Sequence, residues 1–376
     1  MAEQRPLTGI QVVSLEQAAA APLCTRRLAL AGAEVIKIER PEGDFARNYD
    51  SAVFGESSYF VWLNAGKKSV VLDLKTEDGL TQLKALIDRA DVLVQNLKPG
   101  ALSALGIDLD ELHKSIPELI SVSITGFHPD GPGADRKAYD LLMQAESGLA
   151  DITGSQHEAG RVGVSVVDAS TGMYAYEAIL EALLMRARTN QGAQISVALF
   201  DAVADLLTVP YLLERYGGSA PERVGLAHPG ICPYGVFISA DQQRFILSIQ
   251  NEREWQRLCH LGLSRGDLLA DVRCVDNVTR VANRTFVDGE VQSTFEKLNY
   301  TDIDRNLDRA GLAYAPVNGL AALKDHSDFH TYDARVGDQC VQLPIVPGHP
   351  AGETLSIPAL GEHTDEVLDG LVNSKK

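Results

Sequence analysis

The stretch GIQVVSLEQAAAAPLCTRRLALAGAEVIKIE, residues 9–39, decides the fold of this protein. It opens with a run typical of a buried strand at 9–16, continues with a helical pattern at 22–33 and closes on a second strand-like run at 34–39. A strand, a crossover helix and a parallel strand almost always form a right-handed unit, because only that hand packs the helix back onto the sheet. The stretch therefore predicts an α/β fold.

The same alternation continues through the first half of the chain. Strand-like runs recur at 68–74, 91–97 and 119–127, and the amphipathic segments between them are typical of helices at 77–90 and 110–118. Short strands separated by helices of this length predict right-handed βαβ units on a parallel sheet.

The pattern changes after about residue 200. Residues 206–224 are predicted to form a linker helix that leads away from the sheet. Beyond it, residues 225–322 mix short strands, Gly/Pro/Asp turns and helices, which indicates a smaller α+β domain.

Composition restricts the possible partners and the cellular compartment. The chain has 376 residues, 45% of them hydrophobic, and a formal net charge of −17, which argues against nucleic acid or an anionic membrane as its main partner. Five cysteines without a CxxC pair favour reduced thiols in the cytoplasm. The N-terminus has no apolar segment typical of a secretory leader, and no run approaches the ~20 apolar residues of a membrane span.

Asp168 is the first candidate for chemistry. It lies in RVGVSVVDASTGMYAYEAILEALL, residues 161–184, between a predicted strand at 162–167 and a predicted helix. A carboxylate at the end of a parallel strand lies where open α/β sheets bind ligands, and it can attack an activated acyl group. Helix capping is the alternative role for Asp in this place.

The turn after the first strand, Glu16–Pro22, contains alanines where a dinucleotide-binding protein has GxGxxG, so a nicotinamide-dependent dehydrogenase is disfavoured. Arg40, Lys75 and Lys137 follow strand-like runs in a chain that is otherwise acidic. They indicate a polyphosphate ligand, with ordinary surface charge as the alternative. No metal site is predicted, since His326 and His330 have no third ligand within reach along the sequence.

Longer motifs resemble a known family, the class III CoA-transferases, also called CaiB/BaiF, which includes formyl-CoA transferase and carnitine CoA-transferase. The resemblance runs from about residue 6 to the end of the chain. It is carried by PLTGIQVVSLEQAAAAPLCTRRLALAGAEVIKIERPEGD, LNAGKKSVVLDLK, VQNLKPGAL, AYDLLMQAESGLADITG, VDASTGMYAYEAILEALLMRARTNQGAQISVALFDA and GEHTDEVL.

This resemblance implies an architecture. A large Rossmann-like CoA-binding domain would comprise 1–205 and a return segment, 323–376, with the small domain between them. Two chains would form an interlocked-ring homodimer. No cofactor would be permanently bound, because CoA thioesters are the substrates.

The resemblance also implies site residues. Asp168 matches the family's nucleophilic aspartate, and Gln17 and Asp140 are expected to take part in catalysis. Contacts with CoA are expected from Gln17, Ala18, Arg40, Leu72, Lys75, Asn96, Leu97, Lys137 and Tyr139. The related racemases carry a catalytic His where this chain has Tyr139, which disfavours racemisation.

Within the family, SLEQAAAAP, GDFARNYD and IQNEREW look most similar to the branch that acts on C4–C5 dicarboxylates. Itaconate, mesaconate, citramalate and malate are the expected acceptors, with succinyl-CoA as the expected donor. A distal carboxylate needs a cation or hydrogen-bond donors, and the candidates are Arg47, Arg223 and His228.

The expected reaction passes through an aspartyl-CoA thioester on Asp168. This requires an ionised carboxylate, which a helix N-terminus favours more than a closed apolar pocket does. Two alternatives remain: an intramolecular CoA-transferase of the mesaconyl-CoA isomerase type, and a non-catalytic acyl-CoA-binding protein.

Overall fold

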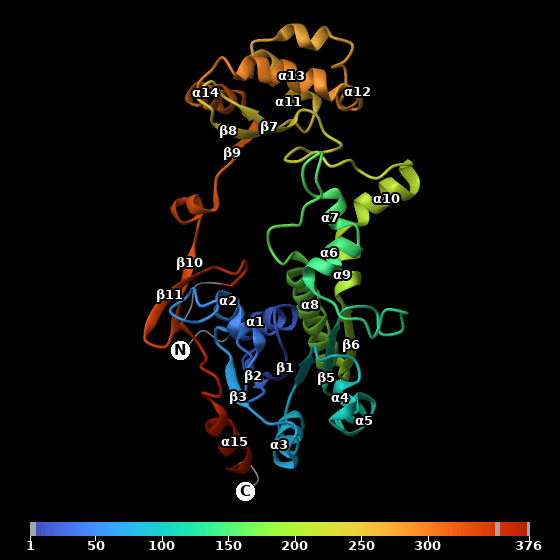
Figure 1. Cartoon of the computed structure of the whole chain (residues 1–376), viewed down its shortest axis with the longest axis vertical. Helices are drawn as coiled ribbons and strands as arrows, with labels where there is room; N and C mark the ends of the chain where they lie inside the picture. The colour runs from blue at the N-terminus through green and yellow to red at the C-terminus, as the bar shows by residue number, and fades with distance from the viewer. Residues whose placement is uncertain (1–4, 350–353, 374–376) are drawn as a thin grey trace. The chain divides into compact units, whose positions relative to one another are not determined.

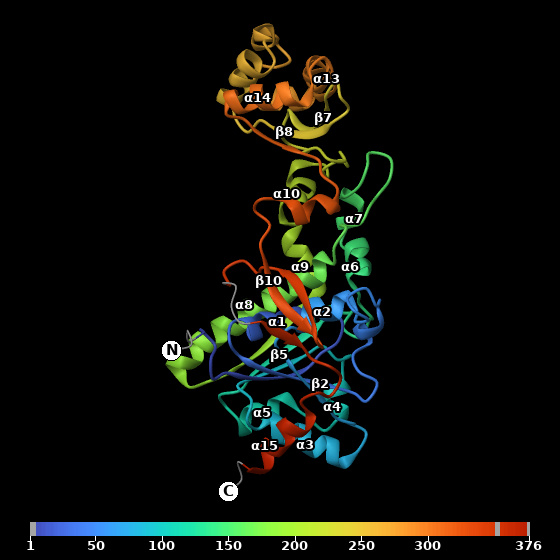
Figure 2. The ribbon, with the colours of Figure 1, turned by 90° about the vertical axis from the view of Figure 1, so that its left-hand side faces the viewer.

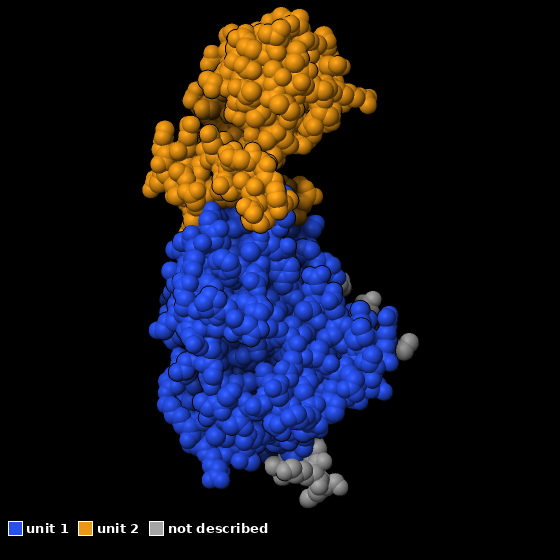
Figure 3. All heavy atoms as spheres, turned by 90° about the vertical axis from the view of Figure 1, so that its right-hand side faces the viewer, with its two compact units in different colours: residues 1–149, 162–209, 330–376 blue, residues 150–161, 210–329 orange. Residues whose placement is uncertain are grey.

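A computed structural model describes residues 5–349 and 354–373 (Figure 1). The chain divides into two compact units, which Figure 3 distinguishes by colour. Unit 1 comprises 1–149, 162–209 and 330–376, and unit 2 comprises 150–161 and 210–329. These units differ from the predicted domain limits at 150–161 and at 323–329, since both segments group with unit 2.

Unit 1 is built on a six-stranded sheet whose strand pairs are all parallel. The strand order is β3-β2-β1-β4-β5-β6. The first three strands are added toward one edge of the sheet and the last three toward the other edge, so the order of addition reverses between β1 and β4. Open sheets of this order bind ligands at the carboxyl ends of the strands beside that reversal. The strands are β1 (Gln11–Leu15), β2 (Glu34–Glu39), β3 (Lys68–Val71), β4 (Val92–Gln95), β5 (Ile120–Thr125) and β6 (Ala193–Ala198).

Helices cover both faces of this sheet. On one face, alternating apolar residues of β1 to β4 pack against α3 (Glu77–Ile87) and against residues of α4 (Ala101–Ala104), α5 (Leu109–Ser115) and α15 (Thr364–Asn373). The other face carries α1 (Ala20–Leu30) and the long α8 (Val166–Thr189), which pack side by side. Because α8 leads into a parallel strand, its N-terminus lies at the carboxyl end of the sheet.

The return segment adds a second, three-stranded sheet to unit 1. Its strands are β10 (Thr331–Val336), β11 (Gln339–Pro344) and β12 (Leu355–Ile357). Their apolar side chains pack against α2 (Ser58–Asn64). Figure 2 shows β10 beside this helix. Unit 1 also contains η1 (Phe45–Asn48), α6 (Asp140–Glu146) and α9 (Leu199–Leu206).

Unit 2 has a core of its own around an antiparallel sheet in the order β7-β8-β9. Trp255, Phe245 and Phe295 are its largest buried aromatic residues. Two of its helices, α7 (Leu149–Ile152) and α10 (Thr208–Gly217), begin at the unit boundary. Its other elements are β7 (Tyr234–Ile238), β8 (Arg244–Ser248), α11 (Glu252–Arg257), η2 (Leu258–Gly262), η3 (Gly266–Ala270), α12 (Asn277–Ala282), α13 (Arg284–Phe295), α14 (Tyr300–Ala310), β9 (Ala313–Pro316) and η4 (Leu320–Asp325).

Two local predictions were wrong. Residues 162–165 form no strand, because the chain there is irregular and α8 already begins at Val166. The predicted linker helix at 206–224 is interrupted at Leu207, between α9 and α10, and its helical part ends at Gly217. None of the helices in the described part of the chain is long and apolar enough to cross a membrane.

Candidate active site

The site begins where α1 and α8 approach each other most closely. A Cβ added at Gly172 would lie 2.6 Å from the Ala20 carbonyl oxygen and 2.9 Å from the Leu23 Cβ. Only glycine allows this approach. As a result, the residues just before α1 lie beside the first turn of α8, and Ala19 and Ala169 pack in one apolar cluster with Leu63.

Asp168 lies in that first turn of α8 and is half-buried. It does not cap its own helix. The Asp140 carboxylate takes that role, because its Oδ1 accepts the backbone N–H groups of Val167 (2.7 Å) and Asp168 (3.2 Å). In the part of the chain that the structure describes, the Asp168 carboxylate itself has no hydrogen bond or ion pair. A carboxylate held by its backbone and free at its oxygens is suited to nucleophilic attack.

Burial, together with the nearby charge of Asp140, raises the pKa of Asp168 to about 7. The sequence led us to expect a helix N-terminus that keeps this carboxylate ionised. The helix N-terminus is present, but desolvation outweighs it. Asp168 therefore loses its proton near neutral pH, and the ionised carboxylate predominates only above about pH 7.

The loop that faces α8 is held in an unusual conformation. Ala18 has a φ of +61°, in the left-handed region that residues with a Cβ rarely adopt. Asn96 follows β4 and bonds the Gln17 backbone twice, donating to its carbonyl oxygen (2.8 Å) and accepting its N–H (2.9 Å). Asn96 thus joins the ends of β1 and β4 at the point where the sheet order reverses.

An aromatic group lies next to Asp168. The Tyr59 hydroxyl hydrogen-bonds the Ser165 hydroxyl (2.8 Å), and its ring packs edge-on against Tyr49 and Trp62. Burial and the carboxylates of Asp44 and Asp168 raise the pKa of Tyr49 to about 12, so this phenol lies near both acids and stays protonated. The sequence analysis did not identify Tyr49 or Tyr59, because only the fold brings residues 45–62 to the start of α8.

A small pocket opens at the carboxyl ends of β1, β2 and β4. Gln17, Arg40 and Leu97 line it together, as the sequence analysis expected of CoA-binding residues. The Arg40 side chain is about half exposed, and its Nε donates to the Gly43 carbonyl (2.9 Å) and lies 3.9 Å from the Glu42 carboxylate. Its two terminal nitrogens have no hydrogen bond to the residues that the structure describes. Such a guanidinium can bind a phosphate in bidentate fashion.

The other expected CoA contacts occupy different environments. Lys75, Lys137 and Tyr139 are exposed, with Lys75 on the turn before α3 and the other two just before α6. Leu72 is only 2% exposed and packs in the core, so only its backbone can meet a ligand.

The first predicted substrate residue, Arg47, is bound inside unit 1. The Arg47 guanidinium is bound to the Glu39 carboxylate (2.7 and 2.9 Å) and stacks over the Phe60 ring at 3.6 Å. It also donates to the Pro358 carbonyl. An internal carboxylate thus already pairs with this cation, and a role of Arg47 toward a substrate carboxylate stays a prediction.

The two remaining substrate candidates belong to unit 2. Arg223 pairs there with the Asp151 carboxylate at 2.8 Å, and the His228 ring stacks on Tyr234. Their role toward a substrate stays a prediction.

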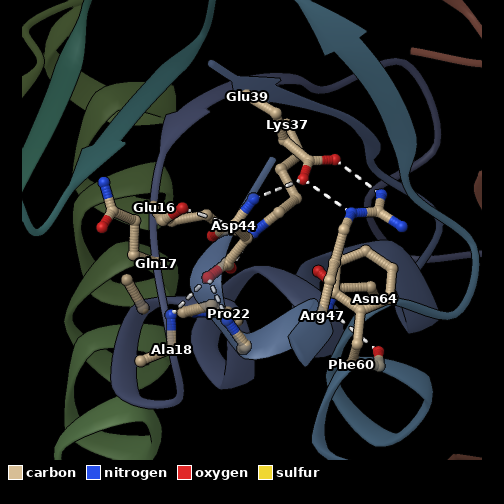
Figure 4. A network of polar contacts seen from close by, with 12 residues as sticks. Glu16, Gln17, Ala18, Pro22, Lys37, Glu39, Asp44, Arg47, Phe60 and Asn64 are labelled. Atoms are coloured by element: carbon tan, nitrogen blue, oxygen red, sulfur yellow. Dashed lines mark hydrogen bonds and ion pairs between the residues drawn. The ribbon is translucent and has the colours of Figure 1, made fainter. Parts of the chain in front are cut away.

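A buried ionic network lies beneath the 16–18 loop and was not predicted (Figure 4). Lys37 is bound to Asp44 (2.9 Å) and Lys67 to Glu16 (2.7 Å), and the four side chains are fully buried. The signal was present in β2, EVIKIE, where Lys37 and Glu39 alternate with isoleucines in a strand covered on both faces. Charges on such a strand must find buried partners.

The fold and this site define a class of protein: an α/β protein with a free carboxylate in the first turn of a helix at the carboxyl end of its parallel sheet. Residues 7–364 match the family described as CoA-transferase family III. The chain belongs to this family and is therefore an enzyme of the transferase class.

Individual relatives agree with this assignment. A succinate–glutarate CoA-transferase of Agrobacterium fabrum is 33% identical over 96% of this chain and 95% of its own length. A succinyl-CoA:mesaconate CoA-transferase of Haloarcula hispanica is 31% identical over 96% of each chain. The crystal structure of a CaiB/BaiF family protein from Brucella suis superposes with a TM-score of 0.82 at 33% identity, over 98% of this chain and 100% of that one.

Proposed function

We propose that this enzyme transfers CoA from succinyl-CoA to a C4–C5 dicarboxylic acid through a thioester on Asp168. The observation that carries the proposal is the free Asp168 carboxylate, held in the first turn of α8 by Asp140 and placed beside the 16–18 loop.

The proposed chemistry consists of two exchanges that mirror each other. An Asp168 oxygen attacks the thioester carbonyl carbon of succinyl-CoA, the carbon–sulfur bond breaks, and CoA leaves as a thiolate. The thiolate then attacks the Asp168 carboxyl carbon of the resulting anhydride, which releases succinate and leaves an aspartyl-CoA thioester. An acceptor carboxylate repeats both steps in reverse and restores Asp168.

Each attack creates an oxyanion that needs hydrogen-bond donors. Gln17 is the candidate donor, because its side-chain amide has no partner among the described residues and points away from the buried network (Figure 4). The N-termini of α1 and α8 supply positive dipole ends beside it, which favour developing negative charge.

The named activities of the relatives support a dicarboxylate substrate. Those relatives are named for succinate with glutarate and for succinyl-CoA with mesaconate, and a third, from Chloroflexus aurantiacus, for succinyl-CoA with D-citramalate. The proposed acceptors are therefore short acids with two carboxylates, among them itaconate, mesaconate, citramalate, malate and glutarate.

The experiment is a coupled assay of the purified protein with succinyl-CoA against these acids, combined with trapping. Hydroxylamine added during turnover converts an aspartyl thioester to a hydroxamate, which peptide mass spectrometry locates. We expect the modification on Asp168 and only in the presence of acyl-CoA. Turnover that leaves Asp168 unmodified would contradict the route.

An intramolecular transferase, which moves CoA between the two carboxylates of one acid, is the second candidate. The same fold and the same aspartate support it, and acceptor dependence separates the two. An intermolecular enzyme needs a free acid, whereas an isomerase converts its acyl-CoA without one.

We further propose a cytoplasmic, interlocked homodimer. Large apolar side chains of α8 remain exposed in the single chain, with Leu184 at 66% and Met185 at 56% exposed, and such patches mark interfaces. The thiols of all five cysteines are free, which suits a reducing compartment. Light scattering should give twice the chain mass of 40.6 kDa.

A further inference from the structure

The two peptide units that flank the Gln17 Cα are bound by side chains at every polar group. The Glu16 carbonyl oxygen accepts from the Lys37 Nζ (3.3 Å), and the Ala18 N–H donates to the Asp44 Oδ1 (3.2 Å). Between them, Asn96 bonds both the N–H and the carbonyl oxygen of Gln17. No strand or helix supplies these bonds, so the loop takes its conformation from the three side chains.

Asp44 and Lys37 are themselves coupled. The Lys37 Nζ donates to the Asp44 Oδ2 at 2.9 Å, so one carboxylate contacts both the loop and the lysine. Two further bonds hold Asp44 in place, since the Ala46 N–H donates to its Oδ1 and the Asp44 backbone N–H donates to the Glu39 carboxylate.

Stability alone does not explain these buried charges. Moving ions out of water costs several kcal/mol for each ion, and apolar replacements of the same shape are often neutral or stabilising. An ion pair does, however, fix the positions of its partners by directional bonds. The pair touches the backbone on both sides of Gln17, which is where a fixed position matters for the proposed reaction.

The strained conformation of Ala18 agrees with this interpretation. A left-handed conformation is unfavourable for a residue with a Cβ and persists where its surroundings hold it. Here the Ala18 N–H is bound to Asp44, while the Gln17 side chain makes no hydrogen bond within the described ranges, 5–349 and 354–373. The loop is fixed at its backbone and leaves the Gln17 amide free for a ligand.

We propose that Asp44 and Lys37 are positioning residues of the transfer reaction, which fix the backbone of the 16–18 loop and thereby aim the Gln17 amide at the reacting carbonyl. Neither residue touches the substrate in this scheme. The proposal rests on the proposed function, in which Gln17 stabilises an oxyanion formed beside Asp168.

The first test compares Asp44→Asn with Asp91→Asn as a matched control. Both carboxylates bind a cation with one oxygen and a backbone N–H with the other, since Asp91 pairs with Arg186 (2.9 Å) and accepts from the Gln11 N–H (2.8 Å). Asp91, however, lies at the amino end of the sheet. We expect Asp44→Asn to lower kcat about 10- to 100-fold with KM for acyl-CoA within about threefold, and Asp91→Asn to change neither.

The second test is a double-mutant cycle with Gln17→Ala. If Asp44 acts through Gln17, the double variant is no slower than Gln17→Ala alone, to within about threefold. If the losses of kcat in Asp44→Asn and Gln17→Ala multiply in the double variant, the proposal is overturned. Equal kcat values for Asp44→Asn and Asp91→Asn would also overturn it. Urea unfolding of each variant separates a loss of stability from a loss of rate.

A second variant covers the case in which Asp44→Asn fails to fold. Asn96 is only half-buried and holds the same peptide, so Asn96→Ala should show the same lack of additivity with Gln17→Ala. Hydroxylamine trapping distinguishes the two proposals. A wild-type enzyme that turns over without a modified Asp168 overturns the proposed route, whereas a modified Asp168 together with additive effects overturns the positioning role alone.

Discussion

Asp140 accepts the backbone N–H of Asp168 at 3.2 Å and also raises the pKa of that residue by its charge. One carboxylate therefore both orients the proposed nucleophile and disfavours its ionised form. The Gln144 side chain, fully buried, donates to the second oxygen of Asp140 at 2.7 Å and holds it in place.

Replacing Asp168 by asparagine should abolish transfer and stabilise the protein. We expect a rate loss of at least about 10³-fold, because an amide cannot form the thioester. The raised pKa means that wild-type stability falls as pH rises from about 4 through 7, since the folded state binds the proton more tightly. Asp168→Asn lacks this loss. At pH 8 its free energy of unfolding, measured by urea denaturation, should therefore exceed that of the wild type by about 2 kcal/mol.

The pH dependence of the reaction should follow the same group. Asp168 attacks only as a carboxylate, so kcat/KM for acyl-CoA should fall about tenfold per pH unit below about pH 7. Above pH 7 this limb should be flat. Initial rates from pH 5 to 8.5 at constant ionic strength test this, and a profile without a break near neutrality would contradict the assignment.

Asp140→Asn should shift this limb to lower pH. The change removes the charge that helps to raise the pKa of Asp168 and keeps an oxygen that can accept from Val167. Asp140→Ala should also lose the helix cap and destabilise the protein by about 1–2 kcal/mol. A break that stays at the wild-type pH in Asp140→Asn would show that burial alone raises the pKa.

Gly172→Ala should be strongly destabilising. Its Cβ would lie 2.6 Å from the Ala20 carbonyl oxygen, so α1 and α8 must separate, at a cost of about 1–3 kcal/mol. Gly289→Ala is the control, because this glycine is also inside a helix and its added Cβ meets nothing within 4 Å. The control should gain about 0.5–1 kcal/mol in urea unfolding.

Arg40→Gln should weaken binding of the CoA phosphates without changing the chemical step. We expect KM for acyl-CoA to rise about tenfold with kcat unchanged, because an exposed guanidinium contributes binding that is equal in the ground and transition states. Arg305→Gln removes a still more exposed arginine from unit 2 and should have no effect. An equal KM for both variants would remove Arg40 from the CoA site.

Local pattern was sufficient for the sheet. The second strand was predicted at 34–39 and is β2 (Glu34–Glu39), and its parallel pairing with β1 is confirmed. Alternating apolar residues and a capped helix are properties of consecutive residues, so they can be read from one segment at a time.

The same reasoning failed at 162–167, and the cause is tertiary. The backbone N–H groups of Val162 and Val167 donate to the side chains of Gln144 and Asp140, which lie 18 and 27 residues earlier in the chain. Partners from another helix replace the strand pairing that the apolar run suggested, so the run is irregular and then helical.

The sequence by itself determined the α/β class, the family and the place of Asp168 near the start of a helix, since each depends on residues that are close together in the chain. The tertiary structure decided the pKa of Asp168, the pairing of Arg47 with Glu39 and the network around Lys37 and Asp44. Desolvation and charge interactions depend on distances through space. Those distances exist only once strands and helices from distant segments have packed together.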